Sequence, residues 1–285
     1  MVRRDAVGAL FHPKISSELP AIEELSAYLS SRGLRLWRST RLEGRQSLHE
    51  EMARTRLIIT FGGDGTFLRG ARGAVRWRIP VLGTNLGRLG FLTEVELDGL
   101  TEAVGRFLDG DFRLERRLVL TARIAHLGQL GRPMLAINEV VLERAASKHL
   151  IRFQLWLDHV DLGLLDADGV LVSTATGSTA YALALGGPIV APTVSDLVIV
   201  PMNPFALTVR PIVVGAGAEI TIELPRDDAE ATVDGQVSRR LRAHDLLVVG
   251  THPHDLEVVR FSSPGEFYKR VRGKLGWGSP LVPDA

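Results

Sequence analysis

The chain has 285 residues, which is long enough for two domains with separate hydrophobic cores. A formal net charge of +1 gives no general electrostatic reason to expect nucleic acid or an acidic membrane surface as a partner. The sequence contains no cysteine, so disulfide bonds, thiolate metal ligands and a cysteine nucleophile are excluded.

The first hundred residues alternate short apolar runs with amphipathic segments. Strands are predicted at 6–11, 34–37, 57–61 and 79–82, and helices at 17–31, 48–54 and 97–108. Short strands that alternate with helices indicate βαβ units and a parallel sheet, whose ligands bind at the carboxyl ends of the strands. We therefore expect an N-terminal, Rossmann-like α/β domain over residues 1–110.

Strands dominate the sequence beyond Asp109-Gly110-Asp111. They are predicted at 118–124, 134–142, 151–157, 170–173, 197–200, 207–214, 219–224 and 246–249, with one short helix near 179–185. The basic cluster Arg113–Arg117 contains Glu115 and is typical of a solvated strand edge. We expect a larger, mostly β domain over residues 111–261. A strand at 256–261 and a helix at 264–274 follow, and segment 262–285 is expected to pack back onto the first domain.

No targeting or membrane-spanning segment is predicted. Only a short apolar-leaning stretch precedes His12-Pro13, too little for the apolar region of a signal sequence. No apolar run reaches the length needed to span a bilayer. We therefore expect a cytoplasmic protein with neither a membrane nor a nucleic-acid partner.

The segment Gly62-Gly63-Asp64-Gly65-Thr66 directly follows the predicted buried strand 57–61. A helix is expected to start near Phe67, with Thr66 as its cap. A strand, a glycine-rich turn and a helix N-terminus together form an anion site that suits phosphate. Asp64 would repel a phosphate, so its presence indicates a general base for an attacking hydroxyl, or a ligand of a metal that carries the phosphates. The alternative is an ordinary tight turn.

Two polar segments follow further along the chain. In the glycine-rich loop Gly83–Phe91, Arg88 is a candidate phosphate ligand and Phe91 a candidate for stacking on a base, although the loop taken alone favours a simple connection anchored to the core by Phe91 and Leu92. Asn138-Glu139 interrupts an apolar run. A buried pair of this kind needs polar partners, which a ribose diol or an adenine edge would supply; a strand end at the surface is the alternative.

A hydroxyl-rich segment, Asp168–Tyr181, leads from a predicted strand into a short helix. Its Ser and Thr side chains and the N–H groups at a helix start suit hydroxyls, amides or phosphates, and Tyr181 can stack and donate a hydrogen bond. Gly186-Gly187-Pro188 ends this helix. Asp234-Gly235-Gln236 lies between β segments and favours a hairpin turn.

Taken together, these segments resemble the NAD kinase family. The resemblance rests on Gly-Gly-Asp-Gly-Thr, Asn-x-Gly-x-Leu-Gly-Phe, Asn-Glu, Asp-Gly-x-x-x-Ser-Thr-x-x-Gly-Ser-Thr-Ala-Tyr, Gly-Gly-Pro and Asp-Gly-Gln, in that order over residues 62–236. It implies a fold of the NAD kinase and diacylglycerol kinase type. It also implies ATP-dependent phosphorylation of the 2′-hydroxyl of the adenosine ribose of NAD, which gives NADP.

The resemblance also implies roles for individual residues. Asp64 is expected to be the general base, and Gly62, Gly63, Gly65 and Thr66 to surround the phosphates of an ATP donor that carries Mg²⁺ without direct protein ligands. The residues expected to bind NAD are Asp64, Gly65, Arg69, Phe91, Asn138, Glu139, His149, Asp166, Asp168, Thr176, Thr179, Ala180, Tyr181, Ala182, Leu183, Ala184, Asn203 and Gln236. Asn203 is expected to reach NAD from a neighbouring subunit, in a homodimer or homotetramer.

Asp166 departs from the family pattern, since bacterial members often carry a basic residue at this place, and this bears on the preference for NAD over NADH. Two other functions compete with NAD kinase: a lipid kinase of the same superfamily and a non-catalytic NAD(P) sensor. The hydroxyl-rich loop Ser173–Thr179 favours a polar nucleotide over a lipid. Asp64 favours catalysis over sensing, because binding alone needs no carboxylate beside a phosphate. ATP and inorganic polyphosphate both remain as donors.

Overall fold

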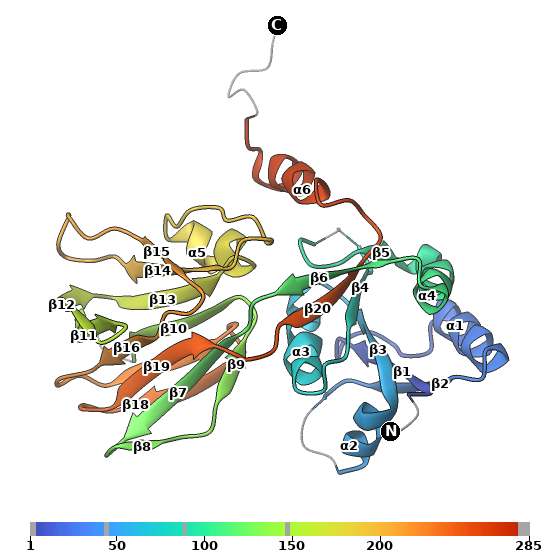
Figure 1. Cartoon of the computed structure of the whole chain (residues 1–285), viewed down its shortest axis with the longest axis horizontal. Helices are drawn as coiled ribbons and strands as arrows, with labels where there is room; N and C mark the ends of the chain where they lie inside the picture. Colours follow the sequence, from blue (N-terminus) through green and yellow to red (C-terminus); the bar gives the residue numbers. More distant parts are fainter. Residues whose placement is uncertain (1–3, 43–45, 88–89, 146–148, 279–285) are drawn as a thin grey trace, which may run out of the picture. The chain divides into compact units, whose positions relative to one another are not determined.

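The computed structural model describes residues 4–42, 46–87, 90–145 and 149–278 (Figure 1). Its contacts divide the chain into two compact units: unit 1 combines Met1–Glu115 with Glu257–Ala285, and unit 2 is Arg116–Leu256. Unit 2 is therefore inserted, as one continuous segment, into the sequence of unit 1. The predicted fold class, a parallel-sheet α/β domain joined to a mostly β domain, is confirmed.

Unit 1 is built on a seven-stranded sheet with the order β2-β1-β3-β4-β20-β6, in which β5 pairs with β4. The strands are β1 (Ala6–Phe11), β2 (Arg35–Ser39), β3 (Thr55–Phe61), β4 (Val81–Asn85), β5 (Val95–Glu96), β6 (Arg113–Arg117) and β20 (Leu256–Arg260). Neighbours are parallel from β2 to β20. The central strands are almost continuously buried because helices cover both faces of such a sheet.

The helices of unit 1 follow the period expected for amphipathic segments. They are α1 (Pro20–Ser31), α2 (Gln46–Arg54), α3 (Asp64–Val75), the short η1 (Leu97–Gly99), α4 (Leu100–Asp109) and α6 (Glu266–Leu275). In α1, Ile22, Leu25 and Leu29 share one buried face, and a proline starts the helix, where its missing N–H costs nothing. This face packs with α4 on one core, together with inward-facing residues of β1 and β3.

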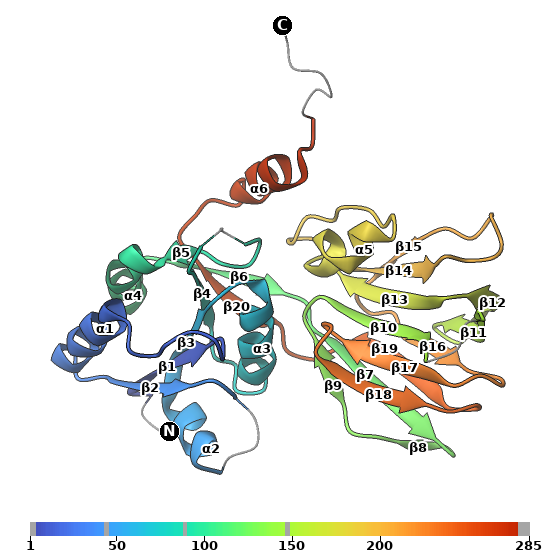
Figure 2. The same ribbon diagram turned by 180° about the vertical axis from the view of Figure 1, so that it is seen from behind.

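Unit 2 contains two antiparallel sheets (Figure 2). One has the order β15-β14-β13-β10-β17-β18; the other has the order β12-β11-β16-β19-β7-β8, with β9 paired to β7. The strands are β7 (Leu120–His126), β8 (Gln129–Leu130), β9 (Met134–Ala136), β10 (Glu139–Arg144), β11 (Ile151–Leu157), β12 (Val160–Ala167), β13 (Gly169–Thr174), β14 (Asp196–Met202), β15 (Ile212–Gly215), β16 (Ile220–Glu223), β17 (Ala229–Val233), β18 (Val237–Leu241) and β19 (Leu246–Thr251).

A single apolar cluster joins inward-facing residues of both sheets of unit 2, among them Val140 and Val172 of one sheet and Phe153 and Leu247 of the other. The other face of the β10–β13–β14 layer is covered by the short η2 (Gly177–Thr179) and α5 (Tyr181–Ala184) segment, through Ala182 and neighbouring apolar residues. The hydroxyl-rich motif is thereby fixed against a fully buried strand, β13.

Three predictions about strands need correction, the third only in part. The predicted strand 134–142 is two strands, β9 and β10, because the chain passes from one sheet to the other at Ile137–Asn138. The strand predicted at 207–214 begins only at Ile212. The cluster 113–117 is the edge strand β6, with Leu114 and Arg116 exposed as predicted. Glu115 and Arg117 are instead buried, because Glu115 pairs with the buried Arg260 of the adjacent β20 and Arg117 donates to Thr176.

Among the described residues, no helix combines the length and the apolarity needed to cross a membrane.

Candidate active site

Asp64 is the first residue of α3, directly beyond the carboxyl end of β3. The N–H groups of Thr66 and Phe67 donate to the carbonyl oxygen of Gly63 at 3.0 and 3.2 Å, so Gly63 caps the helix. The prediction that Thr66 caps a helix starting near Phe67 is wrong, because the backbone already turns helical at Asp64. An acidic side chain in the first turn is favoured by the partial positive charge of the helix N-terminus.

The carboxylate of Asp64 is held by the loop that follows β4. Its Oδ2 accepts the N–H of Phe91 at 3.0 Å, and its Oδ1 accepts the N–H of Leu92 at 3.1 Å. An ionised carboxylate has acceptor sites for about four hydrogen bonds, so each oxygen keeps a lone pair for a further proton. The half-buried Asp64 is thus fixed in orientation and remains able to accept a proton.

The same loop is fixed from its carbonyl side. Arg270 of α6 donates to the carbonyl oxygens of Phe91 and Thr93 at 3.0 and 2.8 Å. Arg260 of β20 donates to the carbonyl oxygen of Leu92 at 3.0 Å. Both guanidinium groups also bind Glu94, at 3.0 Å from Arg260 and 3.4 Å from Arg270.

Glu94 is buried and bears its charge. Burial by itself would raise the pKa of Glu94, but the Arg260 guanidinium and the N–H groups of Ser262 and Phe261 outweigh that cost and hold the pKa below its ordinary value. Removing one member of such a buried charged cluster leaves its partners without compensation, which is strongly destabilising. The segment 90–94 is therefore fixed by hydrogen bonds with α3, β20 and α6.

Two further predicted site residues belong to unit 1, the NAD-binding candidate Arg69 and the phosphate candidate Arg88. Arg69 lies one turn beyond Asp64 on α3 and donates from Nη2 to the carbonyl oxygen of Phe11 at 3.0 Å. Burial, Arg72 and Arg41 lower the pKa of Arg69. Its Nε has no hydrogen-bond partner in the described part of the chain and can donate to an anion. Arg88, the other candidate, lies outside the described residues.

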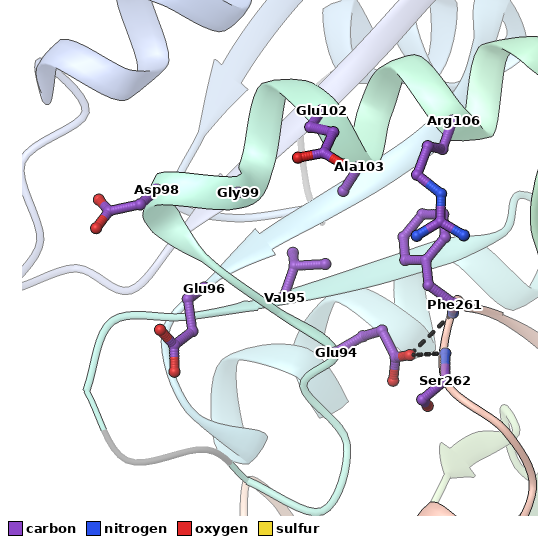
Figure 3. A pocket seen from close by; sticks show the side chains of 10 residues that line it. All are labelled: Glu94, Val95, Glu96, Asp98, Gly99, Glu102, Ala103, Arg106, Phe261 and Ser262. Atoms are coloured by element: carbon purple, nitrogen blue, oxygen red, sulfur yellow. Dashed lines mark hydrogen bonds between the residues drawn. The ribbon is translucent and has the colours of Figure 1, made fainter.

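A cavity of about 530 Å³ opens elsewhere in unit 1, between the start of α4 and the end of β20 (Figure 3). Its lining includes the carboxylates of Glu94, Glu96, Asp98 and Glu102. Such a lining repels phosphates, and none of the predicted site residues contributes to it. We conclude that this cavity is not the nucleotide site.

In unit 2, Asn138 and Glu139 lie where the chain crosses from one sheet to the other. The carboxylate of Asp234 accepts the N–H groups of Ile137 at 3.1 Å, Asn138 at 2.8 Å and Glu139 at 3.4 Å. On the opposite side, the Thr174 hydroxyl donates to the carbonyl oxygen of Ile137 at 2.6 Å. The crossing is thus fixed by residues that are distant in sequence.

Asp234 begins the hairpin turn between β17 and β18, as the sequence predicts. Asp234 and Gly235 have φ angles of 48° and 61°, which is the pattern of a type I′ turn and explains why Asp-Gly is found there. Sequence reasoning recognised the turn and missed the second role of Asp234, which holds the Asn138–Glu139 segment.

The side chains of Asn138 and Glu139 are buried, and their oxygens Oδ1 and Oε2 have no hydrogen-bond partner among the described residues. Unsatisfied buried polar atoms are rare because each costs about 1–3 kcal/mol. Burial first, and then the nearby charge of Asp234, raises the pKa of Glu139 to about 8. Glu139 is therefore protonated at neutral pH and can donate as well as accept a hydrogen bond.

Replacing Glu139 by Gln is expected to remove a pH dependence of stability. Between the ordinary pKa of 4.5 and about 8, the folded chain holds one more proton at Glu139 than the unfolded chain. The free energy of unfolding therefore falls as pH rises through this window, by up to about 1.4 kcal/mol per unit. We expect urea unfolding to show Glu139→Gln gaining on the wild type from pH 5 to pH 8.

The matched control is Glu143→Gln, a half-buried position on the same strand. A stability difference between Glu139→Gln and the wild type that stays constant across these pH values would show that Glu139 is not protonated in the native state.

The hydroxyl-rich segment lies on the β13–α5 connection, as predicted. The hydroxyls of Ser173, Thr174 and Ser178 are however fully buried and donate to backbone carbonyl groups, so they shape the connection rather than face a ligand. Thr176 is buried, and its hydroxyl accepts a hydrogen bond from Arg117 at 3.2 Å. Tyr181 is 41% exposed. Partial burial and the carboxylates of Glu143, Asp168 and Glu139 raise its pKa, so the phenol stays protonated and available as a donor.

Of the remaining predicted site residues, two are aspartates with charged or polar partners, and the others differ in how far they are buried. Asp168 pairs with Asn203 at 2.9 Å and with Arg144 at 3.3 Å, whereas Asp166 forms a two-point ion pair with Arg152 at 2.6 Å. Ala182 is buried in the core; Thr179, Ala180 and Leu183 are half-buried; and Ala184, His149 and Gln236 are exposed. The pair with Arg152 gives Asp166 a local counter-charge at the position where the family often has a basic residue.

In the part of the chain that the structure describes, no group of three or more His, Asp or Glu side chains is arranged to hold a metal ion.

Two models of known protein families match this chain, each over a different stretch of the sequence. The model of the ATP-NAD kinase N-terminal domain matches residues 20–112, and that of the ATP-NAD kinase C-terminal domain matches residues 137–261. The chain belongs to the ATP-NAD kinase family. As a member of this family it is a phosphotransferase that uses ATP and NAD.

Relatives in this family share the sequence over most of its length. The NAD kinase of Gemmatimonas aurantiaca is 41% identical over 225 residues, which cover 78% of this chain and 77% of the relative. That of Acinetobacter baylyi is 42% identical over 224 residues, or 78% of this chain and 72% of the relative.

Two solved structures share the fold. The structure of yeast NADH kinase complexed with NADH matches with a TM-score of 0.86 at 23% identity, over 99% of this chain and 90% of that one. The structure of an NAD kinase from Archaeoglobus fulgidus in complex with ATP has a TM-score of 0.75 at 22% identity, over 95% of this chain and 98% of that one. Each of these two matches therefore includes residues of both units of this ATP-NAD kinase family member.

Proposed function

We propose that the protein transfers the γ-phosphate of ATP to the 2′-hydroxyl of the adenosine ribose of NAD, giving NADP and ADP. The observation that carries this proposal is Asp64, which starts α3 after a glycine pair and is aimed by two backbone N–H groups. A carboxylate held in this way suits proton abstraction from a hydroxyl, and the neighbouring helix start suits phosphate.

In the proposed reaction, Asp64 accepts the proton of the ribose 2′-hydroxyl while the hydroxyl oxygen attacks the γ-phosphorus. The bond from the γ-phosphorus to the oxygen that bridges it to the β-phosphate breaks, and ADP leaves. Phosphoryl transfer needs positioning and charge neutralisation more than covalent help, so a fixed base, glycines that admit the phosphates and Arg69 together meet its requirements.

We assign the adenosine end of NAD to the buried pair Asn138 and Glu139. Their unsatisfied oxygens need partners, and the ribose hydroxyls and the adenine amino group are suitable donors. Glu139, protonated at neutral pH, can in addition donate to an acceptor nitrogen of adenine. Phe91 and Tyr181 supply aromatic faces for stacking, and Thr176 together with Thr179–Ala184 supplies the wall of the adenine pocket.

Asp168 is assigned to the nicotinamide riboside end, with His149, Asp166 and Gln236 as further contacts. Asn203 is assigned to NAD bound by a neighbouring subunit, which makes the active protein a homodimer or homotetramer in the cytoplasm. Sedimentation equilibrium tests this assembly, and a monomer that turns over normally would remove the assignment of Asn203.

Mg²⁺ would be carried by the ATP substrate, where it would neutralise the charge of the phosphates. The one carboxylate in the sequence 62–66 is that of Asp64, which already accepts two backbone hydrogen bonds, and this fits a metal carried by the nucleotide. The decisive experiment is a coupled assay of NADP formation with purified protein, NAD, and either ATP or polyphosphate, with and without Mg²⁺. We expect turnover with ATP and Mg²⁺ and its loss when EDTA removes the metal.

The outcomes of this assay separate the competing functions. Tight NAD binding without turnover under any donor would favour an NAD(P) sensor. Absence of NAD binding in calorimetry would favour a lipid kinase, which ranks second to NAD kinase because both matching family models are those of ATP-NAD kinase domains.

A further inference from the structure

The loop that orients Asp64 is bonded to the Asp64 carboxylate through its N–H groups and to two guanidinium groups through its carbonyl groups. The N–H groups of Phe91 and Leu92 point to the Asp64 carboxylate, and the carbonyl groups of the same two residues accept from Arg270 and Arg260. Each of these residues is therefore bonded to a carboxylate on its N–H side and to a guanidinium on its carbonyl side. Hydrogen bonds in such chains polarise and strengthen one another.

Among the described residues, the side chain of Arg270 donates hydrogen bonds to carbonyl groups of this loop and to the carboxylate of Glu94. Its side chain is 9% exposed, Nη1 reaches the carbonyl oxygens of Phe91 and Thr93 at 3.0 and 2.8 Å, and it lies 3.5 Å from that of Gly90. Nη2 binds Glu94 at 3.4 Å. A residue that merely attached α6 to unit 1 would need only the ion pair with Glu94. The bonds to the loop carbonyls instead fix the peptides that hold Asp64.

We propose that Arg270 is a positioning residue for phosphoryl transfer, which sets the orientation of the Asp64 carboxylate through the peptides of residues 90–93. This inference rests on the proposed role of Asp64 as general base. It assigns to α6, which contains none of the family motifs described above, a direct influence on the rate of the chemical step.

The chemistry of the side chain supports this role. A guanidinium has five N–H donors in a fixed plane, so one Arg can satisfy several carbonyl oxygens and a carboxylate at once. A lysine ammonium is a flexible point charge and reproduces only part of this arrangement. One turn further along α6, the ammonium of Lys274 lies 5.7 Å from the centre of the Phe91 ring, a second contact from the same helix to the same loop.

The test compares Arg270→Met and Arg270→Lys with Arg272→Met, a matched change at an exposed position of the same helix. We expect Arg270→Met to lower kcat about 10- to 100-fold, because a displacement of about 1 Å at a catalytic group has effects of this size. We expect an almost unchanged KM for NAD, and an intermediate kcat for Arg270→Lys. A merely structural role would lower the folded fraction, which calorimetric NAD binding measures, and would leave the kcat of the folded protein unchanged.

A double-mutant cycle gives the sharper readout. If Arg270 acts through Asp64, adding Arg270→Met to Asp64→Asn changes kcat by less than about twofold, since coupled residues are not additive. Full additivity would overturn the inference, as would a folded Arg270→Met or Arg270→Lys with the kcat of Arg272→Met. Normal turnover of Asp64→Asn alone would instead remove the proposed function. If Arg270→Met does not fold, Arg270→Lys carries the same cycle.

Discussion

Replacing Asp64 by Asn is expected to lower kcat by about 10²–10⁴-fold, the range typical for loss of a general base. The amide has nearly the shape of the carboxylate, but it cannot accept the proton of the ribose hydroxyl. Its NH₂ group also faces one of the two backbone N–H donors at Phe91 and Leu92, which loses its acceptor. NAD binding is expected to persist, because the buried pair Asn138 and Glu139 is untouched.

The measurement is kcat in the coupled assay, with NAD binding followed separately by calorimetry. Asp98→Asn is the matched control, because Asp98 is an exposed carboxylate near the start of another helix of unit 1. If Asp64→Asn turned over at a rate close to that of Asp98→Asn, Asp64 would not be the base.

Gly90→Ala is expected to reduce kcat by at least about 100-fold, because it displaces the base by a distance that positioning cannot tolerate. A methyl group at Gly90 would lie 2.0 Å from Oδ1 of Asp64 and 2.6 Å from its Cγ. The carboxylate must therefore move, and its bonds to Phe91 and Leu92 must break or stretch. Melting temperature is expected to change little, because the clash is with the end of a side chain rather than with the core.

The control is Gly87→Ala in the same loop, where the added methyl group meets no atom within 4 Å. Comparison of kcat with melting temperature for the two variants separates displacement of Asp64 from general damage to the loop. Equal kcat values for Gly90→Ala and Gly87→Ala would show that the orientation of the carboxylate does not limit the reaction.

Elements that consist of a buried apolar run were predicted at or near their observed bounds. β1 and β11 have the predicted ends, because the continuous apolar run of β1 and the alternation of β11 are local properties of the sequence. β12 was missed, since most of its residues are exposed or half-buried and it is defined by pairing with β11 across a turn at Asp158-His159. The division of 134–142 was missed because an apolar run does not reveal in which sheet it pairs.

The glycine-rich turn 62–66 and the Asn138–Glu139 segment were recognisable from the sequence. The residues that hold these two segments in place were not. Asp64, Asn138 and Glu139 stand out because a charged or polar group in an apolar strand context requires a reason. Asp234 and Arg270 lie at ordinary positions, a hairpin turn and an amphipathic helix. Their roles depend on hydrogen bonds to residues 96 and 179 positions away in sequence, which no local pattern encodes. The variants of Asp64, Glu139 and Arg270 test the predicted roles of these three residues.

The insertion of unit 2 into unit 1 has a consequence for the order in which the protein is made. Residues 116–256 leave the ribosome as one continuous segment that contains β7 to β19, so the strands of unit 2 are all present before β20 is synthesised. In the sheet of unit 1, by contrast, the place between β4 and β6 stays open until Leu256–Arg260 emerges (Figure 1). Domains generally fold as units during synthesis, and unit 1 is the late one here although its sequence begins first. A nascent chain can thus complete the fold that carries Asn138 and Glu139 before it has the two arginines that fix the loop around Asp64.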